Sequence, residues 1–308
     1  MEQIIASVAL PVGEALQIKK NSISGGTGSK RLCVVTGTHG DELEGQYVCW
    51  KLAQTLQSGL EYLDGTVEIY PALNPLGINT IVRGMPLCDL DMNRMFPGST
   101  DGSMPEYVTA LITQDLLGAD VCVDIHASNI FLREIPQVRI SEEMAHDLLP
   151  LAHMLNMDFI WLHSAATVLQ STLAHTLNTS GVRTLVVEMG VGMRITQDYG
   201  DRLVDGILSL MHSLGMWTKA VAPVAPPIIS SDGSVAFINA NTCGVFLPCA
   251  EHTQRVRKGE LLGTIVDPLS GDIKEEILSP RAGLLFTLRA YPVVYAGSLI
   301  ARILGGNL

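Results

Sequence analysis

Apolar residues in the first two thirds of the chain follow two spacings that alternate. Four continuous apolar runs are typical of buried strands: residues 31–37, 65–74, 120–128 and 184–190. Four other segments carry apolar residues at helical spacing: residues 43–58, 108–117, 141–157 and 200–215. Alternating strands and helices are typical of an α/β fold. The pattern therefore predicts a mixed sheet flanked by helices on both faces.

The predicted helix at 141–157 contains a candidate start signal and an internal helix breaker. Ser141 is a suitable N-cap, because its side chain can accept a hydrogen bond from the first turn. Pro150 lies inside the segment and lacks a backbone N–H, so we expect the helix to kink or split there.

The pattern changes near residue 222. Residues 220–233 hold three prolines and predict an extended linker. Beyond it, short apolar runs are separated by Gly and Pro every eight to twelve residues, which is typical of a small all-β unit. We therefore predict a catalytic domain at 1–221 and a smaller all-β barrel-sandwich domain at 222–308, called here the C-terminal β domain.

Composition and charge narrow the class of protein. The length of 308 residues suits about two domains, and a hydrophobic content of 47% excludes a disordered chain. The net charge of -11 argues against nucleic acid as a partner. No apolar run reaches membrane-spanning length, and the N-terminus lacks the basic start of a signal peptide. Six scattered cysteines are interpreted as reduced, buried thiols, with a thiolate metal site as the alternative. These features predict a cytoplasmic protein.

Groups able to do chemistry follow three of the predicted strands. His39 and Glu42 come after the strand at 31–37, His126 ends the strand at 120–128, and Glu188 lies in the strand at 184–190. The ends of strands in open α/β sheets are where catalytic groups gather. Zinc takes nitrogen and oxygen ligands, with three from the protein in catalytic sites. His39, Glu42 and His126 are therefore a candidate zinc set.

Other interpretations of these residues stay open. His39 and Glu42 taken alone also fit a pair on a surface turn. Glu188 can be a general base, a fourth ligand or a structural ion-pair partner, and the role of Asp124 is undecided between structural and ligand-orienting. The Gly- and Pro-rich segment 72–99 carries arginines and an asparagine suited to a carboxylate or carbonyl, but it also fits a structural loop with solvated arginines.

Four motifs in this order resemble the succinylglutamate desuccinylase/aspartoacylase family, relatives of the zinc carboxypeptidases. They are G-T-H-G-D-E, then N-P…R…D-x-D-M-N-R-x-F-P-G, then D-I-H, then V-V-E-M-G, within residues 31–192. The resemblance implies a zinc carboxypeptidase-like fold with one zinc per chain. The roles that it implies are zinc ligands at His39, Glu42 and His126, a general base at Glu188, a carbonyl-polarising Arg83, a carboxylate grip by Asn93 and Arg94, and an Asp91 that orients His39.

The spacing of short apolar runs and of Gly and Pro residues in the C-terminal β domain resembles that of biotinyl/lipoyl-type barrel-sandwich domains. Such domains display a modified lysine on a hairpin, but residues 267–271 of this chain contain none. We therefore expect no covalent cofactor there, and a lid over the active site or an oligomer contact fits better.

The predicted function is a zinc-dependent amidohydrolase that cleaves the amide of a small N-acyl amino acid. Zinc-activated water would attack with Glu188 as base. One alternative is a metallocarboxypeptidase acting on short peptides. Another is a non-catalytic binding module with a retained metal site. The expected partner is a small, carboxylate-bearing molecule, without nucleic acid or membrane. Assembly into a homo-oligomer stays open.

Overall fold

A computed structural model describes residues 1–163, 170–231 and 234–305. Its largest element is a mixed sheet of 13 strands. Along the sheet the order is β1 (Glu2–Ala9), β2 (Ala15–Gly25), β4 (Gly65–Tyr70), β3 (Arg31–Thr36), β5 (Val121–Ala127), β8 (Arg183–Gly190), β6 (Leu132–Ser141), β15 (Gly283–Arg289), β17 (Leu299–Leu304) and β10 (Val235–Asn239). Three strands branch from this path: β7 (Phe159–His163), β9 (Ile228–Ser231) and β12 (Arg255–Val256).

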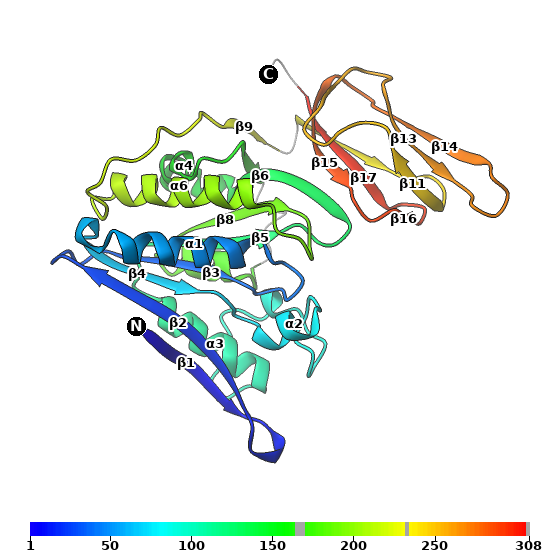
Figure 1. Ribbon diagram of the computed structural model, residues 1–308. Coiled ribbons are helices and arrows are strands. Elements are labelled where there is room, and N and C mark those ends of the chain that lie inside the picture. The colour runs from blue at the N-terminus through cyan, green and yellow to red at the C-terminus, as the bar shows by residue number, and fades with distance from the viewer. Residues whose placement is uncertain (164–169, 232–233, 306–308) are drawn as a thin grey trace.

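Helices cover both faces of the sheet in the first part of the chain, which confirms the predicted fold class (Figure 1). One face carries α1 (Glu44–Ser58), α4 (Ala145–Ala152) and α6 (Gln197–Ser213). The other carries α3 (Met104–Leu116) and α5 (Leu173–Thr179). The short α2 (Pro75–Thr80) lies within the segment 72–99 that was predicted to carry site residues. Among the described residues, no helix is both long and apolar enough to cross a bilayer.

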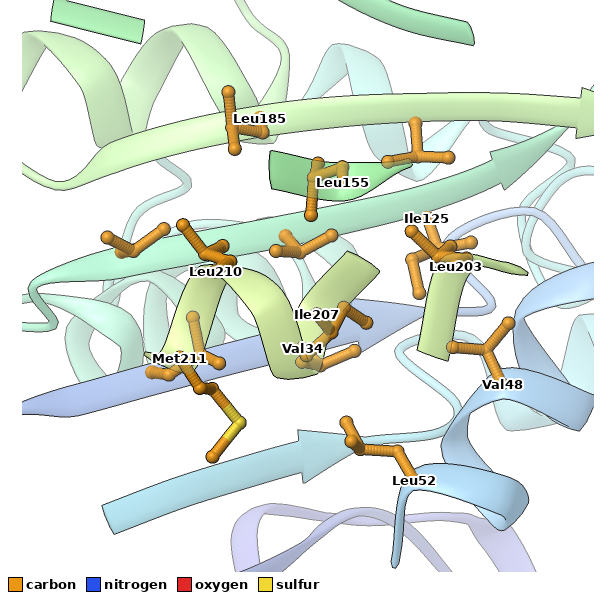
Figure 2. Close-up of a cluster of buried hydrophobic side chains, with 14 of the residues drawn as sticks. Val34, Val48, Leu52, Ile125, Leu155, Leu185, Leu203, Ile207, Leu210 and Met211 are labelled. Atoms are coloured by element: carbon orange, nitrogen blue, oxygen red, sulfur yellow. The ribbon is translucent and has the colours of Figure 1, made fainter. Parts of the chain in front are cut away.

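The amphipathic pattern of α6 fixes one helix on the sheet. Leu203, Ile207 and Leu210 recur at helical spacing and are fully buried. Figure 2 shows these side chains lying against Val34 and Ile125 of the central strands. Each such burial contributes roughly 1.5–3 kcal/mol. The central strands are thereby held rigidly, and so are the residues that follow their ends.

The C-terminal β domain is built from two sheets, as the predicted sandwich requires. An antiparallel sheet of four strands has the order β14 (Ile273–Leu278), β13 (Leu261–Val266), β11 (Gly244–Pro248) and β16 (Val293–Val294). Its buried side chains, such as Phe246 and Ile265, share one apolar cluster with Leu285 of β15 and Ile303 of β17. Strand β15 pairs with β6, so the main sheet continues into this domain. Figure 1 shows the two parts side by side along that junction.

Three details of the sequence interpretation were wrong. Residues 220–233 are not a linker throughout, because β9 lies within them and pairs in parallel with β7. Ser141 does not start a long helix: it is the last residue of β6, and a 3-10 turn, η4 (Glu142–Met144), precedes α4. Of the six free cysteines, Cys243 and Cys249 are exposed. The division at residue 221 stays a prediction.

Pro150 lies inside α4, and the structure shows no kink or split at that residue, where the sequence predicted one. The helix continues only to Ala152 and passes into a 3-10 turn, η5 (His153–Leu155). The remaining short turns are η1 (Pro11–Gly13), η2 (Leu60–Tyr62) and η3 (Met92–Arg94). The last of these positions several of the residues discussed next.

Candidate metal centre and active site

Three central strands of the large sheet bring the candidate residues together. Strands β3, β5 and β8 are neighbours and run parallel, so their carboxyl ends share one edge of the sheet. His39 follows β3, while His126 and Glu188 are direct register partners on β5 and β8. Residues far apart in the sequence are therefore gathered by strand order alone.

His39, Glu42 and His126 form a group able to hold a metal ion. One ligand atom from each lies within 4.8 Å of the other two. His39 Nδ1 is 2.7 Å from Glu42 Oε1, and His126 Nδ1 is 2.9 Å from Glu42 Oε2. All three side chains are buried. Two imidazoles and a carboxylate are ligands that zinc accepts, and three protein ligands leave one position open.

Two further carboxylates stand behind the two histidines. Asp91 Oδ1 lies 3.0 Å from His39 Nε2, and Asp124 Oδ1 lies 3.2 Å from His126 Nε2. Asp91 is itself held in place, because it caps η3 by accepting a hydrogen bond from the Asn93 backbone. A carboxylate at the far nitrogen fixes the tautomer and the ring orientation of a metal-binding histidine. The position of Asp124 therefore favours the orienting role over a purely structural one.

The electrostatics of this group favour a cation. Burial lowers the pKa of His39, but its contacts with Asp91 and Glu42 outweigh burial and raise that pKa above its ordinary value. Burial likewise disfavours a charged His126, yet Asp124 and Glu42 hold its pKa well above normal. Burial raises the pKa of Glu42, whereas the two histidines pull it below its usual range. Positive charge is stabilised here, and a divalent cation on the deprotonated ligands would supply it.

Replacing Asp124 by asparagine should weaken zinc binding by about 10–100-fold, because the orienting acceptor of His126 loses its charge. Titration of the metal-free protein with zinc against a competing chelator would measure this. Asp115→Asn is a suitable control, since Asp115 belongs to a separate ion-pair cluster with Lys20. Equal zinc affinity in the wild type and Asp124→Asn would show that Asp124 does not act through His126.

A cavity of about 680 Å³ opens beside the candidate metal centre. This is in the range of small-molecule sites. Its lining includes the three candidate ligands, Glu188, and the loop residues Arg83, Asn93 and Arg94. All the site residues expected from the sequence, except Asp91, thus line one cavity. Asp91 contacts His39, which is one of the lining residues.

The loop residues differ in what already engages them. Arg83 donates to Glu42 Oε1 at 2.8 Å and is 40% exposed at the cavity. Asn93 accepts a hydrogen bond from the Leu173 backbone, which ties the loop to α5. Arg94 donates to the carbonyl of Asn93 and has no carboxylate partner among the described residues. Arg94 is therefore the guanidinium best placed to receive an anionic group from a ligand.

Glu188 has a different neighbour from the metal group. Burial raises the pKa of Glu188 above the ordinary carboxyl value, although Arg139 and His126 oppose it. Arg139 Nη1 lies 3.3 Å from Glu188 Oε1. A carboxylate with a raised pKa that remains half-buried in a cavity suits proton transfer near neutral pH.

Four charged residues of the cavity were not identified as site residues by the sequence interpretation: Glu134, Arg139, Glu143 and Arg302. Glu134 and Arg139 belong to β6, a strand that the sequence interpretation did not identify. Arg302 comes from β17 and is the one lining residue contributed by the described part of the C-terminal β domain. The sequence feature that could have indicated this strand and its charged residues is the segment at 132–141, where charged residues interrupt a β-compatible run.

The chain resembles known proteins along most of its length. One curated relative, the N-alpha-acetyl-L-2,4-diaminobutyric acid deacetylase of Halomonas elongata, is 33% identical over 123 residues, which are 40% of this chain and 35% of the relative. The match thus spans about a third of that relative's length.

Solved structures with the same fold cover nearly the whole chain. A succinylglutamate desuccinylase from a Silicibacter species has a TM-score of 0.83 at 20% identity, with 95% of this chain and 90% of that one covered. A succinylglutamate desuccinylase/aspartoacylase from Rhodobacter sphaeroides has a TM-score of 0.82 at 22% identity, with 100% and 96% covered. The product-bound ectoine utilization protein of Ruegeria pomeroyi has a TM-score of 0.81 at 21% identity, with 94% and 89% covered.

A family model matches more than half of the chain. It is described as the succinylglutamate desuccinylase/aspartoacylase catalytic domain, and it aligns with residues 28–214. That range contains every candidate ligand, the loop arginines and Glu188. The chain belongs to the succinylglutamate desuccinylase/aspartoacylase family.

Proposed function

We propose that the protein is a zinc-dependent hydrolase that cleaves the amide bond of a small N-acyl amino acid. The observation that carries the proposal is the convergence of His39, Glu42 and His126 within 4.8 Å beside a cavity that also holds Glu188. Membership of the family and the partial match to a deacetylase support a deacylase. The cavity volume suits a substrate of that size.

Zinc held by His39, Glu42 and His126 would supply Lewis acidity and lower the pKa of water. The remaining steps belong to the side chains. Glu188 accepts the proton of the attacking water and passes it to the leaving amine. Arg83 donates hydrogen bonds to the oxygen of the scissile carbonyl as its negative charge develops. Asn93 and Arg94 hold the substrate carboxylate, which orients the amide toward Glu188.

The test is to measure hydrolysis of a set of N-acetyl, N-succinyl and N-aspartyl-type amides. Short peptides bearing a free C-terminus are assayed in parallel as alternative substrates. We expect hydrolysis of at least one N-acyl amino acid by protein that carries close to one zinc per chain, and loss of that activity on chelation. Preferred cleavage of peptides would replace the deacylase by a carboxypeptidase. Zinc binding without hydrolysis of either class would indicate a binding module.

Arg94→Ala should reduce kcat/KM by roughly 10–150-fold for substrates with a free carboxylate, because a charged hydrogen bond worth about 1.5–3 kcal/mol is lost. The matching amide or ester substrates should lose little. Arg194→Ala is a matched control: Arg194 also donates to the carbonyl of the preceding residue on the exposed surface, but it does not line the cavity. An equal loss for charged and neutral substrates would give Arg94 another role.

A further inference from the structure

A second cluster of charged side chains lies in the wall of the same cavity and contains none of the candidate metal ligands. It consists of Glu134, Arg139 and Arg302, together with Glu188. Arg139 contacts both carboxylates: Nη1 is 3.3 Å from Glu188 and Nη2 is 3.4 Å from Glu134. Arg302 Nη1 is 2.6 Å from Glu134. The proposed base is thus the end of a chain of ionic contacts.

The other end of this chain is in the C-terminal β domain. Glu134 on β6 is the register partner of Thr287 on β15, and Thr287 is the partner of Arg302 on β17. Side chains opposite each other on neighbouring strands are in contact. The Thr287 hydroxyl donates to Glu134 Oε2 at 2.6 Å. One row of residues therefore crosses the junction between the two parts of the chain.

Glu134 is fully engaged by this row and by its own strand. Its Oε2 accepts hydrogen bonds from Thr287 and Gln137, and its Oε1 accepts from Arg302 and Arg139. Four donors fill the acceptor sites of a carboxylate. Glu134 is also buried, so it has no capacity left for a ligand. Its function is to hold other side chains in place.

Arg139, unlike Arg94, also has no capacity left for a ligand, because carboxylates of the protein already engage it. Both of its terminal nitrogens face carboxylates, and the charges of Arg139 and Arg302 balance those of Glu134 and Glu188. A guanidinium neutralised on both sides is a poor receptor for a further anion. Its distance to Glu188 makes that carboxylate the group on which it acts.

Aromatic rings support the two arginines. The guanidinium carbons of Arg139 and Arg302 lie 5.3 and 5.5 Å from the centre of the Trp161 ring. Phe237 of β10 lies 5.3 Å from Arg302. Trp161 is buried and packs edge-on against Phe286 at 5.6 Å. Stacking of this kind restricts the directions in which the guanidinium groups can point.

We propose that Arg139 is a positioning residue for Glu188, and that the C-terminal β domain sets the position of Arg139 through the contacts of Thr287 and Arg302 with Glu134. The inference rests on the proposed function, because it takes Glu188 as the base. It gives the C-terminal β domain a part in catalysis other than that of a lid or an oligomer contact.

The first experiment changes the hydroxyl of Thr287, which is buried and does not line the cavity. Thr287→Val keeps the shape and removes the donor, and we expect kcat to fall about tenfold with KM and zinc content near those of the wild type. Thr287→Ser restores the donor and should retain most of the activity. Thr264→Val, on β13 of the other sheet, is the matched control. Equal kcat in Thr287→Val and Thr287→Ser, each assayed below its melting transition, would overturn the proposal.

The second experiment removes Arg139 directly and does not depend on Thr287. Arg139→Met should lower kcat more than it changes KM, and Arg139→Lys should recover part of the loss. In the Glu188→Gln background, Arg139→Met should cause no further decrease, because it acts through the missing carboxylate. Multiplicative losses in the double variant, or a loss confined to KM, would overturn the positioning role. Normal turnover by Glu188→Gln alone would instead overturn the proposed function, so the two failures are distinguishable.

Discussion

Glu188→Gln is expected to lower kcat by at least ~10²-fold while the protein keeps its fold, its zinc and near-normal substrate affinity. The amide of glutamine is nearly isosteric with the carboxylate but cannot accept the proton of the attacking water. Rapid-mixing or steady-state kinetics would measure kcat and substrate affinity, and metal analysis and a melting curve on the same preparation would measure zinc content and folding. Loss of turnover alone would separate proton transfer from packing.

The structure makes the competing interpretations of Glu188 sharper. Glu188 forms an ion pair with Arg139 at 3.3 Å. If the role of Glu188 is structural, Glu188→Gln should lower the melting temperature and leave kcat unchanged. A ligand role predicts loss of zinc. Glu68→Gln is a useful control, because Glu68 is a buried strand carboxylate paired with Lys20 and Arg31 outside the cavity. That variant should lose stability without a specific loss of turnover.

Replacing both His39 and His126 by alanine is expected to remove the bound zinc and, with it, all measurable hydrolysis. Two of three protein ligands disappear, and the single Glu42 carboxylate cannot hold the ion at micromolar free zinc. Metal analysis after dialysis, together with activity, would measure the effect. Zinc should also raise the melting temperature of the wild type but not of the double variant, since only the former binds it in the folded state.

His212→Ala is the matched control for this loss. His212 is exposed in the last turn of α6, where its ring contacts the Trp217 carbonyl, and it does not line the cavity. The control should retain its zinc. Full zinc occupancy in the His39→Ala, His126→Ala double variant would overturn the metal assignment and, with it, the proposed chemistry.

The sequence alone determined the fold class and the candidate ligands. Apolar periodicity located β3, β4, β5 and β8 and the helices α1, α3 and α6, because buried central elements are marked by continuous or helically spaced apolar residues. Polar residues at the ends of those strands indicated His39, His126 and Glu188, because parallel strands end at a common edge. Short motifs in a fixed order indicated the family.

Strands β6 and β9 were not predicted, because their residues do not show a simple alternation of apolar and polar positions. In β6, Glu134 and Arg139 interrupt the apolar residues, and in β9 the neighbouring prolines suggested a linker. Both strands are stabilised by pairing with distant partners, β15 and β7 respectively. Local propensity cannot report a pairing between segments far apart in the chain.

Tertiary structure alone decided what surrounds Glu188. Thr287 and Arg302 reach Glu134 only because β15 joins β6 at the junction of the two parts of the chain. Buried charges are tolerated where partners from other strands neutralise them, and those partners lie more than 150 residues away in sequence. The ligands were readable because each follows an identifiable strand, whereas the row behind the base depends on a strand order that no local pattern specifies.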